Sequence, residues 1–221
     1  MLFKGKSSYL LTIIFISMII LAGCVGKKTT VEKMYDVLEN VVAKEKAFEE
    51  QQDPLVTLEK KEKEIYDQII ELGMKEYDQI VKLSDEAILL TDQRKKHMEK
   101  ETKSLKESEQ EFKKAEDLKD KLDDPELKKI ANELSDIMKQ RYEAHDWLYK
   151  EYSNALEYDK ELYVMFKNKN LSLEDLEAQV NKLNDTYKQV DDANKKFNEL
   201  TELYNDKKLS FYKKAGLKSK K

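Results

Sequence analysis

Glycine and proline are almost absent from the chain after residue 26. Beyond that point the sequence contains only Gly73, Gly216, Pro54 and Pro125. A protein built from strands and tight turns needs many more of them, because turns use glycine for a positive φ and proline for a fixed one. Long helices joined by few connections are therefore the architecture that this sequence permits.

The few turn-forming residues predict where the helices begin and end. Asp53-Pro54 and Asp124-Pro125 each have the form of an N-cap followed by proline at the first helical position. The segment from Ser172 to Asp175 has the form of a capping box, and Gly216 follows two lysines as a C-cap glycine does. The prediction is four helices, at about 30–52, 54–122, 125–168 and 172–215.

Apolar residues recur at three- and four-residue spacing along each predicted helix. The last helix is the clearest example, with seven-residue steps through Leu176, Leu183, Val190, Phe197, Tyr204 and Phe211. Charged residues interrupt every run, so the pattern is that of helices packed on one another rather than of a membrane span. We predict an all-α fold, an elongated antiparallel helical bundle or coiled coil of about four helices, one of them very long.

The predicted helix lengths also suggest an arrangement. Short links at Pro54 and Pro125 make the first and third helices antiparallel to the long second one, and the fourth folds back along the third. A three-helix rod extended at one end by a two-helix hairpin results. Gly73 is a candidate bend in the long helix.

The N-terminal residues have the layout of a secretory signal. Lys4 and Lys6 precede an apolar stretch, residues 10–21, that is too short to span a bilayer comfortably. A lipobox follows, made of Leu21, Ala22, Gly23 and Cys24. In such signals the cysteine receives a thioether-linked diacylglycerol and becomes the first residue after cleavage. The alternative is an uncleaved membrane anchor with an incidental thiol.

These features predict the domain organisation. A signal peptide covers residues 1–23, the lipidated cysteine and a short tether 24–29, a helical rod 30–215, and a basic tail 216–221. Cys24 is the only cysteine, so we expect no disulfide and no cofactor or metal, only diacylglycerol and fatty acid such as palmitate on its sulfur. We expect the protein on the extracytoplasmic face of the cell membrane. Abundant Lys, Asn and Ile favour a Gram-positive host.

The sequence favours a protein without enzymatic activity. It contains no glycine-rich phosphate loop, nucleophile elbow or metal-binding histidine pair. His97 and His145 lie in different predicted helices, and a place in the core or an interface explains His145 better than a metal site. Capping explains Asp123-Asp124, and a solvated helix face explains Asp191-Asp192.

Aromatic residues concentrate between residues 142 and 166. Within this stretch, Trp147 and Tyr158 lie together on one shoulder of the predicted apolar seam. Packing against two neighbouring helices is one explanation. The other is a platform on which sugar rings stack while the indole and phenol groups hydrogen-bond hydroxyls.

The C-terminal segment is strongly basic. From residue 205 onward, Asp206 is the only acid among seven lysines, Lys207, Lys208, Lys213, Lys214, Lys218, Lys220 and Lys221. A solvated, frayed terminus is one explanation. The other is attraction to a polyanion. Outside the cell membrane the available polyanions are teichoic acid, peptidoglycan carboxylates and anionic lipid headgroups. The same location excludes nucleic acid as a partner.

The stretch from Phe48 to Ala87 resembles the YkyA-like family of cell-wall-binding lipoproteins. The similarity lies in the lipobox, in the GluGluGlnGln-x-Pro link that ends at Pro54, in the interruption at residues 72–74 and in the helical remainder. The resemblance implies association with the wall and carries over no site residues. We therefore expect a membrane-tethered protein that binds peptidoglycan or teichoic acid. The alternative is a coiled-coil scaffold for a membrane complex or a wall hydrolase, whereas a chaperone or solute receptor lacks a visible cleft signature.

Overall fold

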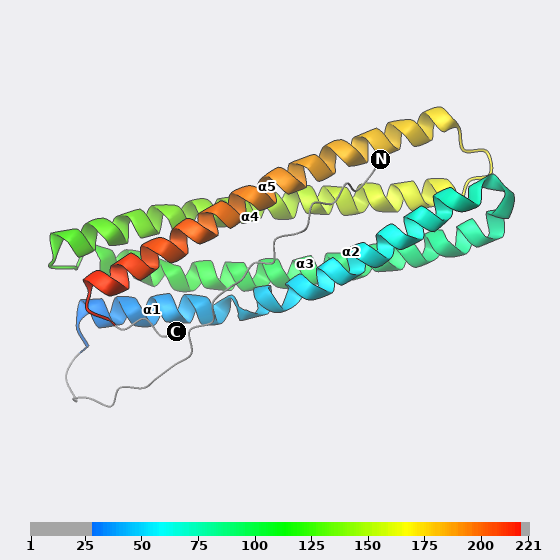
Figure 1. Cartoon of the computed structure of the whole chain (residues 1–221). Helices are drawn as coiled ribbons and strands as arrows, with labels where there is room; N and C mark the ends of the chain where they lie inside the picture. The colour runs from blue at the N-terminus through cyan, green and yellow to red at the C-terminus, as the bar shows by residue number, and fades with distance from the viewer. Residues whose placement is uncertain (1–27, 218–221) are drawn as a thin grey trace. The chain divides into compact units, whose positions relative to one another are not determined.

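The computed structural model describes residues 28–217. The predicted signal peptide, the lipobox with Cys24, and Lys218, Lys220 and Lys221 of the basic tail lie outside the described residues. All regular structure in the described part is helical, which confirms the all-α prediction. The elements are α1 (Thr30–Lys44), α2 (Lys46–Leu72), the 3-10 helix η1 (Gly73–Glu76), α3 (Tyr77–Lys119), α4 (Pro125–Phe166) and α5 (Leu173–Lys214) (Figure 1).

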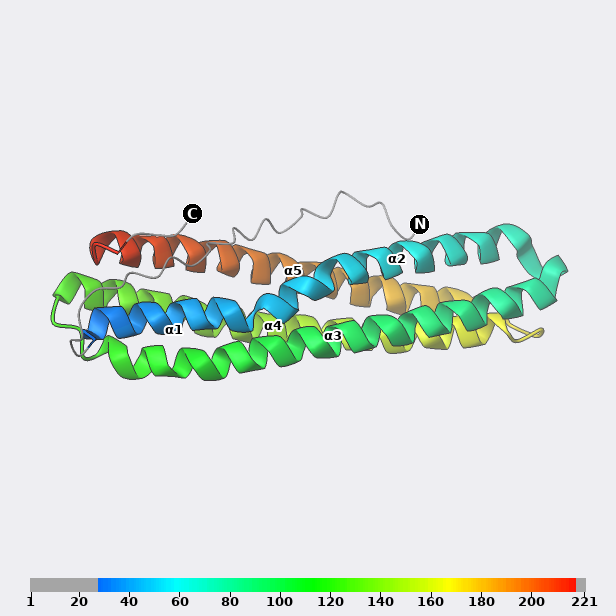
Figure 2. The same cartoon turned by 90° about the horizontal axis from the view of Figure 1, so that it is seen from below.

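The described chain divides into two compact units. Unit 1 comprises residues 28–44, 107–144 and 195–217, and unit 2 comprises residues 45–106 and 145–194. Each unit holds four helical segments that alternate in direction along the chain (Figures 1 and 2). Each is therefore an antiparallel helical bundle, as predicted.

The predicted helix from 54 to 122 is wrong, because the chain reverses at Gly73. Helix α2 ends at Leu72, and α3 runs back beside it in unit 2 after the turn of η1 (Figure 1). Gly73 has φ 58° and ψ −177°, a backbone conformation that is essentially restricted to glycine. The glycine therefore ends the helix instead of bending it. The predicted three-helix rod with a hairpin extension depended on this helix and is also wrong.

The predicted helix boundary at Asp53-Pro54 is wrong as well. Pro54 lies inside α2, and the first helical stretch is interrupted only at Glu45, where no breaker residue marks the sequence. An internal proline costs about 3 kcal/mol because it removes a hydrogen bond and crowds the preceding turn. Phe48 before it and Leu55 after it are both buried in unit 2. Burial of Phe48 and Leu55 on the two sides of Pro54 therefore outweighs the tendency of proline to end the helix.

The other predicted helix ends are confirmed by their hydrogen bonds. The Asp124 carboxylate accepts from the backbone N–H groups of Glu126 and Leu127 at 2.8 and 3.2 Å, and α4 begins at Pro125. The Ser172 hydroxyl oxygen likewise accepts from the N–H of Asp175 at 3.0 Å at the start of α5. These caps satisfy donors that the first helical turn leaves without a partner.

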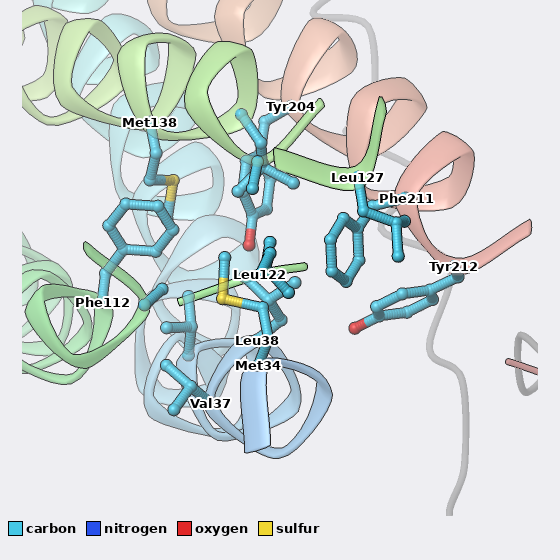
Figure 3. Packing of buried hydrophobic residues seen from close by; sticks show 14 of the residues in the cluster. Met34, Val37, Leu38, Phe112, Leu122, Leu127, Met138, Tyr204, Phe211 and Tyr212 are labelled. Atoms are coloured by element: carbon cyan, nitrogen blue, oxygen red, sulfur yellow. The ribbon is translucent and has the colours of Figure 1, made fainter. Parts of the chain in front are cut away.

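The core of unit 1 is a single apolar cluster, which we call cluster 1 (Figure 3). It joins all four segments and consists of Met34, Val37, Leu38, Val41, Phe112, Ala115, Leu122, Leu127, Ala131, Leu134, Met138, Tyr142, Tyr204, Phe211 and Tyr212. Unit 2 has two smaller clusters. Cluster 2 includes Leu58, Ile65, Leu90, Leu162 and Leu183, and cluster 3 includes Leu55, Met98, Leu148, Leu156 and Val190.

Candidate functional site

The described lysines of the C-terminal segment do not form a uniform exposed patch. Lys207 pairs with Glu133 of α4 at 2.6 Å, and Lys214 pairs with Glu126. Lys208 is buried, and its ammonium lies 5.7 Å from the ring centroid of Tyr204. Lys213 is exposed. Of the described lysines predicted to contact a polyanion, Lys207, Lys208 and Lys214 therefore already have neighbours within the bundle.

Most aromatic side chains of α4 belong to the core. Tyr142 lies in cluster 1, Tyr152 in cluster 3, and Tyr163 and Phe166 in cluster 2, all of them buried. For these four rings the packing explanation is confirmed. Trp147 differs from them, because 40% of its surface remains exposed.

The two predicted stacking residues lie in different environments. Trp147 and Tyr158 are eleven residues apart, which places them on one face of α4 about 16 Å apart along the helix axis. The Tyr158 ring packs against cluster 2, and the Lys182 ammonium lies 3.6 Å from its centroid. A sugar that stacked on this ring would first have to displace Lys182. Trp147 is thus the more accessible of the two rings.

Polar groups lie between these two rings on the same face of α4. Asn154 donates from Nδ2 to the Glu151 carboxylate at 3.2 Å, and Lys150 donates to the same carboxylate at 3.1 Å. Hydrogen-bonding groups beside an exposed indole are the combination that recognises a sugar, since the ring covers its apolar face and the polar groups bind its hydroxyls. This strip, from Trp147 to Tyr158, is the candidate glycan-binding face.

A buried polar layer in unit 2 was not predicted. Its centre is Arg94 of α3, which is only 2% exposed. Its guanidinium donates to Glu62 of α2 at 2.7 Å and to Asp159 of α4 at 3.1 Å. It also donates to the hydroxyls of Tyr152 and Tyr187 at 2.9 and 3.0 Å. Since Tyr187 belongs to α5, Arg94 connects all four segments of unit 2.

The layer contains more acid than base. Glu62 and Asp159 are both buried, and Arg94 is the only cation among residues 28–217 that forms an ion pair with both. Burial away from water raises the pKa of the Asp159 carboxyl to about 7; Glu62 adds to the rise, and Arg94 and Tyr187 oppose it. Two buried carboxylates beside one guanidinium thus favour retention of a proton at neutral pH.

A second buried polar group lies farther along unit 2. His145 Nε2 and a Glu101 carboxylate oxygen are 3.1 Å apart, and Gln52 donates to the other oxygen at 2.9 Å. The His145 and Phe48 rings pack in a T-shaped arrangement, with centroids 6.0 Å apart. The predicted core role of His145 is confirmed. His97 is half-buried, with Nδ1 2.8 Å from the Gln51 side-chain oxygen.

The arrangement suits structure better than catalysis. The Arg94 layer is closed off from solvent by clusters 2 and 3, which flank it on α3, α4 and α5. Among residues 28–217, no three histidine, cysteine or acidic side chains converge as metal ligands do. A sequence signal for the layer existed, since the apolar seam of α3 has a gap between Leu90 and Met98 that Arg94 fills.

Comparisons with known proteins place the chain in a family. Residues 29–214 match the model of the YkyA family, described as "Putative cell-wall binding lipoprotein". The chain belongs to this family. It is 36% identical over 203 residues to the "Uncharacterized lipoprotein YkyA" of Bacillus subtilis (strain 168), covering 92% of this chain and 91% of that protein.

A solved structure shares the fold of this YkyA-family chain. It is the crystal structure of a conserved protein of unknown function from Staphylococcus aureus, with a TM-score of 0.73 and 20% sequence identity. The match covers 85% of this chain and 97% of the other. No helix within the described part of the YkyA-family chain is long and apolar enough to cross a membrane.

Proposed function

We propose that this protein is a lipid-anchored lipoprotein on the extracytoplasmic face of the membrane whose helical body binds a cell-wall polymer without catalysing a reaction. Membership in a family described as cell-wall binding lipoproteins carries the proposal. Diacylglycerol on Cys24, directly after Leu21, Ala22 and Gly23, provides the anchor. Two acyl chains bind a bilayer far more firmly than one, because each buried methylene contributes about 0.8 kcal/mol.

The proposed wall contact is the candidate glycan-binding face of α4. Trp147 supplies an exposed indole, and Lys150 and Asn154, which both donate to the buried Glu151 carboxylate, supply hydrogen-bonding groups within the next two turns. Tyr158 ends the face as a flanking ring that shares its surface with Lys182. Because stacking and neutral hydrogen bonds are only weakly screened by salt, binding through this face is expected to persist as the salt concentration rises.

The test is a pull-down of the mature chain, with Cys24→Ser to prevent lipidation, on purified wall with and without teichoic acid. Trp147→Ala is expected to reduce retention about fivefold to tenfold, since a stacked ring contributes about 1 kcal/mol beyond its buried area. Leu89→Ala is the matched control, because Leu89 is another exposed apolar side chain of unit 2 (61% exposed). Adding Tyr158→Ala to Trp147→Ala should lower retention further.

Retention that is lost at high salt but unaffected by Trp147→Ala would contradict stacking. It would favour the lysine-rich segment as the wall contact. Absence of retention under every condition would reject wall binding by the chain itself.

A scaffold for another protein is the second candidate function. Three large apolar side chains lie exposed near the end of unit 2 that contains η1, namely Ile70 at 52%, Val164 at 58% and Leu173 at 83%. Each lies within about one turn of the end of its helix. The Tyr77 hydroxyl donates to the backbone oxygen of Lys167 at 2.6 Å and so joins α3 to the end of α4 there. Exposed apolar side chains at one end of a bundle favour a protein partner there.

A further inference from the structure

A lysine covers the Tyr158 end of the candidate glycan-binding face. The ammonium of Lys182, on α5, lies 3.6 Å from the centroid of the Tyr158 ring. A cation is attracted to an aromatic ring within about 6 Å of its centroid, so this contact is a close one. The Tyr158 ring also packs against cluster 2. Of the two rings on this face, Trp147 is therefore open to a ligand and Tyr158 is occupied.

Hydrogen bonds from α5 hold this lysine in place. Lys182 donates to Oε2 of Glu161 at 3.1 Å, and the side-chain amide of Gln179 donates to the same oxygen at 3.2 Å. Gln179 is buried, and it also donates to the backbone oxygen of Tyr158 at 2.8 Å. One turn of α5 thus fixes both the Glu161 carboxylate and the backbone of Tyr158. The carboxylate in turn keeps the ammonium over the ring.

The contacts of Lys182 are weak enough to be broken by a ligand. The side chains of Lys182 and Glu161 are 46% and 53% exposed, so water and salt screen their attraction. An exposed ion pair and an exposed cation–π contact each shift an equilibrium by at most about fivefold. A sugar that stacks on the Tyr158 ring can therefore displace the ammonium.

The displaced lysine has another acidic neighbour on its own helix. Asp185 lies three residues after Lys182, is exposed, and makes no ion pair within residues 28–217. Side chains three residues apart on a helix are neighbours, and opposite charges at this spacing attract each other. The Tyr158 hydroxyl makes no hydrogen bond to any other described residue. Once uncovered, Tyr158 therefore offers both a ring face and a free hydroxyl to a sugar.

We propose that Lys182 is a lid over the Tyr158 end of this face, which a wall glycan must displace before it stacks on that ring. The inference rests on the proposed function, in which the α4 face binds a wall glycan. With the lid closed, the glycan stacks on Trp147 alone. With Lys182 displaced toward Asp185, it stacks on both rings, about 16 Å apart along the helix axis. Lys182 thus limits the affinity of the face for glycan.

The first measurement follows the exposure of the Tyr158 ring in the non-lipidated mature chain, by hydroxyl-radical footprinting with mass spectrometry. Lys182→Ala removes the lid and should raise oxidation of Tyr158 relative to Tyr149, a half-buried tyrosine elsewhere on α4. Glu161→Gln should also raise it, because the charge that holds the ammonium is lost. Lys188→Ala is the matched control, since Lys188 is an exposed lysine of α5 without an ion pair in the described part of the chain.

The second measurement is retention of the same variants on purified wall. Lys182→Ala should raise retention about fivefold over Lys188→Ala, because the glycan no longer competes with the ammonium. The gain should vanish when Tyr158→Ala is added. Glu161→Gln should raise retention as well, although it changes the net charge in the opposite direction. A general charge effect cannot produce both increases.

Unchanged oxidation of Tyr158 in Lys182→Ala would overturn the proposal. Wall retention no higher than that of Lys188→Ala, or a gain that persists with Tyr158→Ala, would do the same. Opposite changes in retention for Lys182→Ala and Glu161→Gln would indicate a net-charge effect and also overturn it. No retention by any variant or by the unsubstituted chain would reject the proposed function and the lid's role in it. Retention that depends on Trp147, together with unchanged Tyr158 oxidation, would reject the lid alone.

Discussion

The cores of the two units are built differently. Unit 1 has one continuous apolar cluster of fifteen residues, and none of its described acids is buried. Unit 2 has two smaller clusters and all four buried carboxylates of the described chain, Glu62, Glu101, Glu151 and Asp159. Apolar contacts are non-directional and tolerate sliding, whereas a buried ion pair is favourable only in one arrangement. We infer that Arg94 fixes the register of the four segments in unit 2 at some cost in stability.

The largest expected effect is the loss of that guanidinium. Arg94→Met leaves Glu62 and Asp159 buried without a cation and should destabilise unit 2 by about 3–5 kcal/mol. Trp147 is the only tryptophan and lies in unit 2, so its fluorescence during chemical denaturation reports on this unit. Replacing Glu62 and Asp159 by Leu in the same chain should recover most of the loss. No recovery would show that Arg94 acts by packing alone.

In unit 1 the comparable change is Leu134→Ala. Leu134 is completely buried in cluster 1, so its truncation should cost about 2–5 kcal/mol through lost transfer energy and the cavity left behind. Helix content measured by circular dichroism should report this loss. If Leu134→Ala shifts the Trp147 fluorescence transition as far as it shifts the circular-dichroism transition, the two units unfold together.

Sensitivity to pH should separate the units further. The pKa of Asp159 is raised to about 7 in the folded chain, against about 3.9 unfolded. The folded state therefore holds the proton more tightly, so this contribution to stability is complete below about pH 4 and is lost as the pH rises to about 7. Across that window unit 2 should lose up to about 4 kcal/mol.

The matched variant for this titration is Asp159→Asn, which keeps the size of the side chain and cannot ionise. The difference in unfolding free energy between the two chains should change across the same window and be flat above it. A constant difference would show that Asp159 does not titrate across this window.

A smaller effect is expected at the turn of unit 2. Gly73→Ala should cost about 1–3 kcal/mol, because the backbone conformation is nearly closed to other residues. An added methyl group would meet no atom within 4 Å, so the cost comes from the backbone alone. The measurement is chemical denaturation followed by fluorescence. An unchanged midpoint would indicate that the turn can adopt another conformation.

The features predicted from sequence were those that depend on neighbouring residues. Three helix ends depend on hydrogen bonds between residues a few positions apart, namely those at Asp124, Ser172 and Gly216. A short stretch of sequence is therefore enough to predict them. The role of Gly73 was ambiguous, because one glycine costs a helix only about 1 kcal/mol. The local sequence therefore permits both a bend within a continuous helix and the end of the helix. Pro54 was misjudged because tertiary packing retained the helix around it.

The candidate sites were harder to predict than the helices. Seven-residue spacing correctly identified the buried positions of α5 from Leu183 to Phe211, whereas Leu176, at the start of the series, is only partly buried. Spacing alone did not reveal that Lys182 would lie against Tyr158, because that contact joins α4 to α5. The Arg94 layer likewise depends on four segments that are distant in sequence.

Lipid on Cys24 is proposed to hold this protein at the membrane, with the start of α1 close to the tether. Intact-mass measurement of protein extracted from membranes of the producing cells tests it most directly. The expected mass is that of residues 24–221 with diacylglycerol on Cys24, and Cys24→Ala should abolish both the lipid and the membrane retention. An unmodified Cys24 that still carries residues 1–23 would contradict the account.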